Sequence, residues 1–478
     1  MQEHVSILSI PFHGPPEQVA ALNELKSQFT ITTEMIKKVS GELRIAMDRG
    51  LKTAHEIEPA HIQKHSTDGH CHMAMLQTWI ENHPTGQETG EYLGLELSGS
   101  LVHVYLVKFN GRGHVSIVKQ QKHNLTDDLK TNSLPYLLEY LANTVDEFLT
   151  FSEQAPLALG LALSFPLVQT AINKAYVANW TKTFHVSDYE KKNVVELLQT
   201  ALNRKSLPVK VVAVVNGASA SLLANGYRSL DTLLSCTISN GTNAAYWEKV
   251  NAIEKLGRTD EPDQNETVIN TEWGSFGDDD RSVLPLSMYD NRVNRQSENP
   301  GEQTFEKMVA GQYLGELVRT IIIEFMDRRI LFGGKYTKEL NTPYAFDISY
   351  VGRICQDEEE ELEITGHILE DILGLPSTSL NERQVVKYIC ELVGQRAARL
   401  VGAAISTIID KCHGLNDVVT ISIEGIIYES FPKFPRRLTE ALRRIYGNEN
   451  LNKINIMVTK DGNGIGAALA ALLATTNK

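Results

Sequence analysis

Two hairpins of the same design, one in each half of the chain, constrain the fold of this sequence most. Each consists of a β-prone run, a turn of small residues that includes glycine, and a second β-prone run. The runs are residues 91–97 and 102–108 around Ser98-Gly99-Ser100, and residues 233–238 and 244–250 around Asn240-Gly241-Thr242. Each hairpin opens an α/β unit, which predicts a duplicated architecture with a ligand between the halves. Two unrelated hairpins would give the same local pattern and are the alternative.

The length of the chain favours two domains. Its 478 residues, 42% of them hydrophobic, exceed what one simple core holds. Apolar residues at helical spacing predict amphipathic helices in residues 19–29 and 36–47 and a long buried helix in residues 385–408. We expect the acidic run 357–361 to be a solvated helix face.

The charge and the cysteines narrow the class of protein. A net charge of −13 argues against a nucleic-acid face that neutralises phosphates. The five cysteines are scattered, which predicts free thiols in a reducing compartment. No apolar run reaches the ~18 residues of a membrane span, and the N-terminus lacks the pattern of a secretory signal. We therefore expect no direct nucleic-acid partner, no membrane span and a cytoplasmic protein, with the nucleus or the mitochondrial surface as alternatives.

Histidines and one cysteine crowd into residues 61–72, between the first helices and the first hairpin. Their spacing matches no usual metal-ligand pattern, so we expect a solvated loop, with a metal site as the alternative. No metal ligand is assigned with certainty.

Ordered motifs along the chain resemble those of the hexokinase family. The matching segments include residues 84–100, 163–166, 180–184, 240–243, 269–277, 299–307 and 461–468. The resemblance covers about residues 17–475 and is closest to fungal hexokinases. It implies an α/β chain with the actin-like, ribonuclease H-like ATPase fold, in which two domains close over a cleft.

The resemblance also implies domain boundaries. A small domain would comprise residues 88–215 together with the helix at 462–478. A large domain would comprise residues 216–461 together with the N-terminal helices in residues 1–87.

The sugar contacts of the family are all present in suitable chemistry. A hexose presents a ring of hydroxyls, so its pocket needs carboxylates, amides and hydroxyls at fixed positions. The resemblance assigns these contacts to Ser164, Thr181, Lys182, Asn216, Asn243, Glu272 and Glu306. Taken singly, each has a structural explanation, such as a turn serine or a helix cap; together they favour a hexose pocket.

Gly217 occupies the position of the family's catalytic base. Residues 211–224 resemble a segment in which a strand ends in Asn-Asp-Thr, but here Asn216 is followed by Gly217 and Ala218. In the family that aspartate takes the proton from the sugar's 6-hydroxyl. General-base catalysis contributes ~10²–10⁴-fold, and a hydrogen bond to a charged group ~1.5–3 kcal/mol. The resemblance therefore implies no catalytic residue here, kinase activity that is absent or lower by at least about 1,000-fold, and hexose affinity about tenfold or more weaker.

The nucleotide side departs from the family repeatedly. The first loop of the family usually reads Asp-Leu-Gly-Gly-Thr-Asn-x-Arg, because backbone N–H groups must approach phosphates closely. Here Ser98 stands for a glycine, and His103 replaces the arginine with a weaker, titrating cation. Ile426 and Ile465 replace a serine and a basic residue, while Glu96 keeps the acid that helps to hold magnesium. The family's ATP contacts fall on Glu96, Ser98, Gly99, Ser100, His103, Gly241, Thr242, Gly425, Gly462 and Gly464.

These departures predict a hexokinase-like regulator that is not catalytic. The sugar would bias domain closure, and the resemblance to atypical fungal members suggests carbon-source and starvation signalling, such as control of secreted proteases, through unidentified protein partners. No cofactor is certain, and Mg-ATP is expected only if activity remains or if backbone groups still bind ATP. One alternative is an ATP-dependent hexose or hexosamine kinase of low or altered activity, with a carboxylate delivered from elsewhere, for example from residues 278–280. The other is a scaffold that binds neither ligand.

Overall fold

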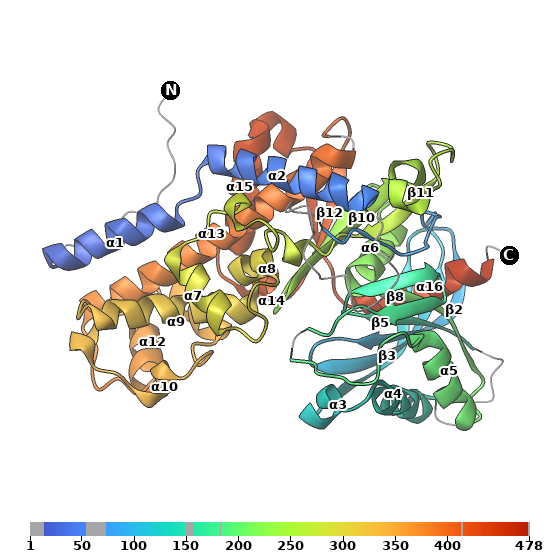
Figure 1. Cartoon of the computed structure of the whole chain (residues 1–478), viewed down its shortest axis with the longest axis horizontal. Helices are drawn as coiled ribbons and strands as arrows, with labels where there is room; N and C mark the ends of the chain where they lie inside the picture. The colour runs from blue at the N-terminus through green and yellow to red at the C-terminus, as the bar shows by residue number, and fades with distance from the viewer. Residues whose placement is uncertain (1–13, 54–72, 150–156, 182, 413, 477–478) are drawn as a thin grey trace.

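The computed structural model describes residues 14–53, 73–149, 157–181, 183–412 and 414–476. These residues form two α/β halves that lie side by side (Figure 1). The histidine-rich connection at 61–72 and Lys182 lie outside the described residues.

A five-stranded sheet with the order β4-β3-β2-β5-β8 forms the centre of the first half. β2 and β3 make an antiparallel hairpin, β4 extends it, and β5 and β8 continue the sheet in parallel. The strands are β2 (Thr89–Leu97), β3 (Leu101–Asn110), β4 (Val115–Asn124), β5 (Leu157–Leu163) and β8 (Val209–Asn216).

Helices cover both faces of this first sheet. α4 (Leu134–Phe148) and α5 (Val194–Arg204) pack on one face, and α6 (Gly217–Arg228) and α16 (Gly462–Thr476) on the other. The last helix of the chain thus returns to the first half (Figure 1). The short helix α3 (Asp127–Thr131) and the hairpin of β6 (Leu167–Ala171) and β7 (Lys174–Val177) complete this half.

The sheet of the second half repeats the design of the first. Its order is β1-β11-β10-β9-β12-β13, with an antiparallel β9–β10 hairpin, β11 beside it, and β12 and β13 in parallel. The duplicated hairpins predicted from the sequence are therefore confirmed, and β1 is an addition at the edge. The strands are β1 (Leu76–Gln77), β9 (Thr232–Ile238), β10 (Thr242–Lys249), β11 (Glu266–Asn270), β12 (Val419–Glu424) and β13 (Ile454–Val458).

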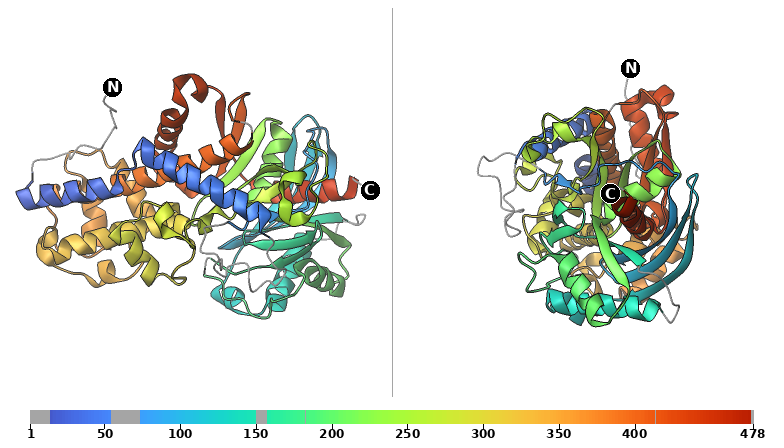
Figure 2. Two further views of the ribbon diagram at one scale, coloured as in Figure 1. Left: turned by 45° about the horizontal axis from the view of Figure 1, so that its top comes forward. Right: turned by 90° about the vertical axis from the view of Figure 1, so that its right-hand side faces the viewer.

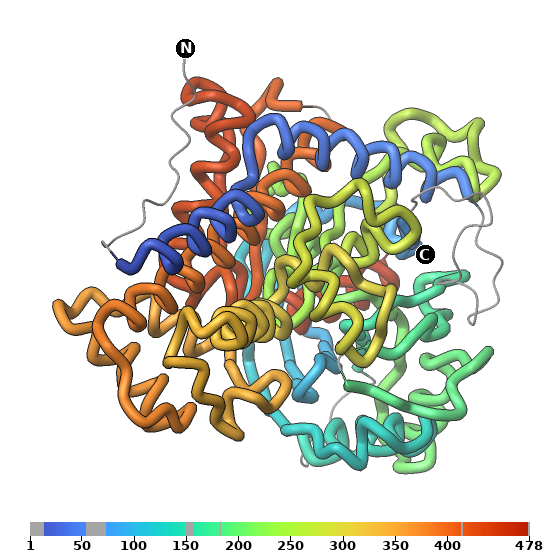
Figure 3. The backbone as a smooth tube through the Cα atoms, turned by 60° about the vertical axis from the view of Figure 1, so that its left-hand side comes forward, coloured from blue at the N-terminus to red at the C-terminus, as the bar shows by residue number. Residues whose placement is uncertain are grey.

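Helices make up most of the second half. α1 (Pro16–Phe29) and α2 (Thr33–Lys52) pack against segments from much later in the chain, and both contact α13 (Figures 2 and 3). The predicted N-terminal helices are thus confirmed, and Thr32 caps α2 by accepting a hydrogen bond from the Met35 amide at 3.1 Å. The others are α7 (Met288–Gln296), α8 (Thr304–Val309), α9 (Gly311–Asp327), α10 (Lys338–Asn341), α11 (Ile348–Gln356), α12 (Glu363–His367), α13 (Leu380–Cys412), α14 (Ile426–Ser430) and α15 (Phe434–Leu451).

Helix α13 is the predicted long buried helix. Among the described residues it is the one helix long and apolar enough, by length and composition, to cross a membrane. Its qualifying 18-residue window is 94% buried inside the protein, which is typical of a core helix. Arg396 on α13 forms a buried pair with Asp290, with nitrogen–oxygen distances of 2.8 and 2.7 Å.

The prediction for the acidic run 357–361 is wrong. These residues connect α11 to α12 and are not helical, although 358–361 are exposed as expected. Asp357 is buried and accepts hydrogen bonds from the amide and hydroxyl of Thr365, each at 2.7 Å. A side chain that satisfies the first turn of a helix explains the acidic residue better than solvation does.

Backbone contacts at glycines hold α16 between the first sheet and α6. An ideal Cβ on Gly160 of β5 would lie 1.8 Å from the Ala467 oxygen, and one on Gly94 of β2 would lie 2.2 Å from the Gly464 oxygen. On the other side, a Cβ on Gly466 would lie 1.8 Å from the Ala220 oxygen of α6. Only glycine permits these approaches. The position of α16 against the first sheet and against α6 is therefore fixed. The domain boundaries given above stay a prediction.

We expect Gly466→Ala to lower the free energy of unfolding by about 2 kcal/mol or more, because backbone must move to admit the methyl group. The matched control is Gly41→Ala in the exposed middle of α2, where no atom lies within 4 Å of the new methyl group. That variant should gain ~0.5–1 kcal/mol. Urea unfolding measures the change in the free energy of unfolding in each variant. Equal changes in Gly466→Ala and Gly41→Ala would contradict the packing described for α16.

Candidate functional site

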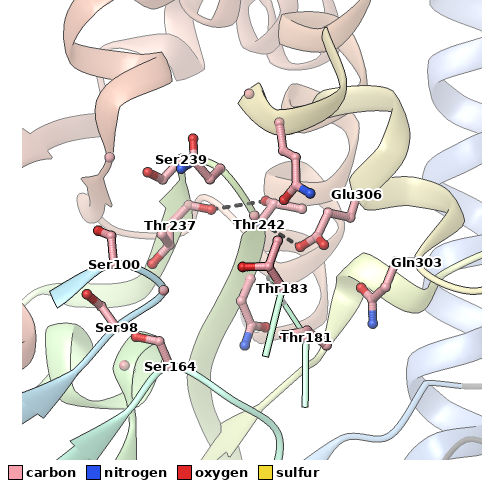
Figure 4. A pocket seen from close by; sticks show the side chains of 18 of the residues that line it. Ser98, Ser100, Ser164, Thr181, Thr183, Thr237, Ser239, Thr242, Gln303 and Glu306 are labelled. Atoms are coloured by element: carbon pink, nitrogen blue, oxygen red, sulfur yellow. Dashed lines mark hydrogen bonds between the residues drawn. The ribbon is translucent and has the colours of Figure 1, made fainter. Parts of the chain in front are cut away.

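A cleft of about 740 Å³ lies between the two halves, where both glycine turns meet the ends of the central strands. Most residues that the sequence analysis assigned to a site line it together (Figure 4). They are Glu96, Ser98, Gly99, Ser100, Ser164, Thr181, Asn216, Gly217, Gly241, Thr242, Asn243, Glu272, Glu306 and Gly425. His103, Gly462 and Gly464 do not line it, and Lys182 is outside the described residues.

The sugar side of the cleft is a network of amides and carboxylates. The Asn243 amide nitrogen donates to Asn270 Oδ1 at 2.8 Å and to Glu272 Oε1 at 3.1 Å. Asn270 donates to the same Glu272 oxygen at 2.7 Å, and the Glu272 amide donates to Asn243 Oδ1 at 3.1 Å. Glu272 has a φ of 52°, so this non-glycine residue is held in the left-handed region by its network. The arrangement presents fixed polar groups to a hydroxylated ligand.

Strand ends bring the remaining sugar-side residues to the same place. Ser164 follows β5, and its amide donates to the Leu97 oxygen at 3.0 Å, next to the first glycine turn. Asn216 ends β8 and caps α6, accepting from the Ala218 amide at 3.0 Å. Glu306 lies on α8 and accepts from the Thr242 amide at 2.8 Å. Parallel strands that end at one sheet edge explain why motifs far apart in sequence meet here.

Gly217 is the first residue of α6 and lies at the floor of the cleft. An ideal Cβ there would lie 3.0 Å from Ser164 Oγ and 3.2 Å from Asn463 Oδ1. Both neighbours are ends of side chains, so a larger residue would fit if they turned aside. These two polar atoms border the position to which the sequence resemblance assigns a carboxylate.

The phosphate end is lined by the two hairpin turns. In the first, the Ser98 amide donates to the Leu101 oxygen at 3.0 Å, and in the second the Ser239 amide donates to the Gly241 oxygen at 2.9 Å. Gly425 follows β12 with a φ of 127°, and a Cβ there would lie 2.4 Å from the Ile238 oxygen. Only glycine meets both conditions.

His103 does not supply the expected titrating cation, and this corrects the sequence analysis. The side chain is buried, and its ring centre lies 3.8 Å from that of Tyr105. Burial, with a contribution from Lys122, lowers the pKa of His103 to about 4, so the ring is neutral near pH 7. Residues 102–105 of β3 are all buried, so alternation along the strand gives no signal that His103 lies inside the protein.

Gly462 and Gly464 serve packing. A Cβ on Gly464 would lie 2.0 Å from the Tyr105 ring, and one on Gly462 would lie 2.5 Å from Ser221 Oγ. Their glycine-rich turn therefore brings α16 against Tyr105 and α6, and neither glycine is exposed to the cleft.

Carboxylates at the phosphate end already have neutral partners. Asn463 donates to Glu96 Oε1 at 2.9 Å, and the Ser221 hydroxyl donates to Glu424 Oε2. Burial raises the pKa of Glu96, and burial together with the charges of Glu96 and Asp461 raises that of Glu424 to about 7. Among the described residues, no group of three or more His, Cys, Asp or Glu could hold a metal ion.

The charges along the cleft fit a polyphosphate poorly. Lys130 is the single described cation in the lining, against the carboxylates of Glu96, Glu272, Glu298, Glu306, Asp347 and Glu424. Such a cleft repels an anion that brings no counterion, whereas a neutral hexose is unaffected. The residues present therefore fit a neutral hexose, and they leave the charge of ATP to be balanced by the magnesium ion that it brings.

Sequence reasoning missed several lining residues. Glu424, Asn463 and Gln303 lay inside recognised motifs, and their motif positions were the available signal. Thr183 also lay inside a matching segment, at 180–184. Lys130 and the aromatic trio Tyr313, Tyr344 and Phe346 carried no motif and reach the cleft through tertiary packing.

Asp278, offered as a replacement base, is bound elsewhere. Its carboxylate accepts from the amides of Gln303 and Thr304 at 2.8 and 2.7 Å, at the start of α8. It does not line the cleft, although burial raises its pKa to about 6. The structure thus corrects the suggestion that this cluster supplies a base.

Comparisons with known proteins agree with this geometry. Two family models described as hexokinase match residues 21–227 and 233–473. The chain is 33% identical to Hexokinase-1 of Saccharomyces cerevisiae, covering 96% of this chain and 93% of that protein. It is 33% identical to Hexokinase-1 of Schizosaccharomyces pombe, covering 96% and 91%. The solved hexokinase of Schistosoma mansoni complexed with glucose superposes with a TM-score of 0.85 at 30% identity, covering 97% of this chain and all of that one. The predicted actin-like fold is confirmed.

The free energy of unfolding should depend on pH through Glu424. Its pKa is raised from 4.5 to about 7, so its stabilising contribution is complete below 4.5 and is lost as pH rises through about 7. The loss amounts to ~3 kcal/mol at most. Glu424→Gln keeps an acceptor for Ser221 and should flatten the dependence between pH 5 and 8, measured by urea unfolding. Glu17→Gln on the exposed surface of α1 is the control, and an unchanged slope in Glu424→Gln would contradict the assignment.

Proposed function

The chain belongs to the hexokinase family, and we propose that it is a hexose-binding regulator in which phosphoryl transfer is lost or strongly impaired. One observation carries this proposal: Gly217 leaves no carboxylate at the floor of a cleft whose described sugar-side residues lie together. Support for a hexose comes from the Asn243–Asn270–Glu272 network and from the glucose complex of the structural relative.

Other carboxylates in the lining have competing partners. Glu306 accepts from the Thr242 amide, and Glu272 from two asparagine amides. Glu424 has a pKa suited to a base, but it accepts from Ser221, one helical turn along α6 from Gly217. The shortage of described cations in the lining adds to the loss of the base, because phosphoryl transfer depends on positioning and charge stabilisation.

A sugar can act as a signal without being phosphorylated. A ligand shifts a conformational equilibrium whenever it contacts one state better than the other, and this cleft takes its lining from both halves. We propose that hexose binding controls unidentified protein partners in carbon-source or starvation signalling, for example in the control of secreted proteases, in the cytoplasm. The nucleus and the mitochondrial surface are the alternative locations.

A second candidate is an ATP-dependent hexose phosphotransferase of low or altered activity. The full-length relatives are named hexokinases, and those names favour this candidate over the regulator. In that case the residues of this chain would orient the hexose, Mg-ATP would supply the phosphoryl group, and Glu424 would be a carboxylate of the lining suited to hold a proton. A scaffold without ligands is the third candidate, and it leaves the sugar-side network without a purpose.

Hexose-dependent ADP release separates these candidates. We expect the unmodified protein to release ADP at no more than about 1/1,000 of the rate of an active hexokinase. Gly217→Asp with Asn463→Ser, which removes the amide oxygen 3.2 Å from the new Cβ, should raise the rate at least about tenfold.

The matched control is Gly217→Asn with Asn463→Ser, which has the size of aspartate and no base. Clear hexose-dependent turnover by the unmodified protein would establish the kinase and reject the regulator.

Glucose should raise the melting temperature of the unmodified protein through the sugar-side network. Glu272→Gln keeps the shape of the side chain but removes the charge that accepts from Asn243 and Asn270. We expect its glucose affinity to fall about tenfold, while Glu17→Gln leaves the affinity unchanged. Thermal unfolding across a glucose titration measures both, and an absent shift in the unmodified protein favours the scaffold.

A further inference from the structure

A half-buried lysine outside the cleft joins two segments of backbone through three carbonyl oxygens. Lys255 lies on the short helix η3 (Glu254–Leu256), and its ammonium donates to the carbonyl oxygens of Gly50, Ala74 and Met75 at 2.8, 2.9 and 2.7 Å. An ammonium has three N–H donors and no acceptor, so these three carbonyls use its full capacity. We call this arrangement the Lys255 clamp.

The clamp fixes the entry to strand β1. Gly50 lies in the last turn of α2, where carbonyls have no partner within the helix. A Cβ on Gly50 would lie 2.0 Å from the Met73 oxygen, so the two backbones touch. Met75 has a φ of 45°, a conformation that needs external support in a non-glycine residue. The clamp supplies a hydrogen bond at that residue.

Strand β1 in turn borders the sugar-side network. Leu76 pairs with Asn270, and the Met75 amide donates to the Thr271 oxygen at 3.4 Å. Asn270 donates to Glu272 at 2.7 Å, and Glu272 is the second left-handed residue of this region. Met75 and Glu272, both left-handed, therefore lie next to the hydrogen bond from the Met75 amide to the Thr271 oxygen. The Lys255 clamp holds Met75.

The chemistry of the clamp is costly for a purely structural contact. Burial alone lowers the pKa of Lys255 to about 7, so desolvation opposes its charge. The charged groups on the elements packed around it are engaged with one another: Lys52 with Glu254 at 2.9 Å, and Asp48 with Lys411 at 2.7 Å. An apolar side chain would avoid this desolvation but would leave the three carbonyls without this donor, which indicates that the hydrogen bonds themselves are needed.

We propose that Lys255 is a positioning residue for the hexose site, acting through β1 to hold Asn270 and Glu272 in their binding geometry. The inference rests on the proposed hexose site and adds to it a residue that touches neither the cleft nor the sugar. Without the clamp, Met75 relaxes, the edge of β11 loosens, and Glu272 leaves the left-handed conformation that its side chain needs to reach Asn243.

The test compares three full-length variants at pH 6, where Lys255 is charged. Lys255→Met keeps the apolar stem and removes the donors, and Lys255→Arg keeps a cation with donors. Lys453→Met is the matched control, because Lys453 also donates to a backbone carbonyl, that of Leu415 at 2.8 Å, but beside β13 at the opposite edge of the sheet. Should Lys255→Met not fold, Lys255→Gln, which keeps one amide donor group, takes its place.

Two readouts separate positioning from general stability. Glucose affinity, by calorimetry, should fall about tenfold in Lys255→Met, recover to within about threefold in Lys255→Arg, and change less than about twofold in Lys453→Met. Hydrogen exchange without sugar should be about tenfold faster at the amides of Thr271 and Glu272 in Lys255→Met alone.

Unchanged exchange at these amides in Lys255→Met would overturn the inference, as would an equal loss of affinity in Lys453→Met. If the unmodified protein binds no glucose, the proposed function fails, and the exchange result then decides by itself whether Lys255 positions Glu272.

Discussion

The close backbone contact of α16 with both the first sheet and α6 is the constraint on which the site depends. Glycines at 94, 160 and 466 let this helix approach to distances that any side chain would prevent. The approach brings Asn463 to Glu96 and to the position beside Gly217. The geometry of this part of the cleft thus follows from packing between residues that lie 246 (Ala220 and Gly466) to 370 (Gly94 and Gly464) positions apart.

The two ends of the cleft have different chemistry. On the sugar side, Asn243, Asn270 and Glu272 bond to one another and hold a strained backbone in place. At the phosphate end, Asn463 and Ser221 donate to the carboxylates of Glu96 and Glu424. His103 is buried and uncharged, and Lys130 is the one cation among the described residues that line the cleft. The difference between the two ends supports the proposal of a hexose-binding protein in which phosphoryl transfer is impaired.

Much of this could be predicted from the sequence because it depends on local patterns. The paired hairpins, the N-terminal helices and the buried α13 follow from alternation and helical spacing, and motif order brought most lining residues together. What could not be predicted depends on tertiary contacts. The family motif gives the position of His103 a cation, but packing on both faces of β3 buries this side chain. The acidic run at 357–361 has the composition of a helix face, yet the use of Asp357 by Thr365 is visible only in the fold. The Lys255 clamp joins residues about 180 and 205 positions apart, which no local pattern signals.

Calorimetric titration of the unmodified protein with glucose, followed by addition of Mg-ATP in the same cell, tests the central claim most directly. If the protein is a hexose-binding regulator, we expect saturable heat on glucose addition and no sustained heat of turnover after Mg-ATP is added. Sustained heat that requires both ligands would show phosphoryl transfer despite Gly217 and would contradict the account. Absence of any glucose heat would contradict it equally, because the sugar-side network would then have no ligand.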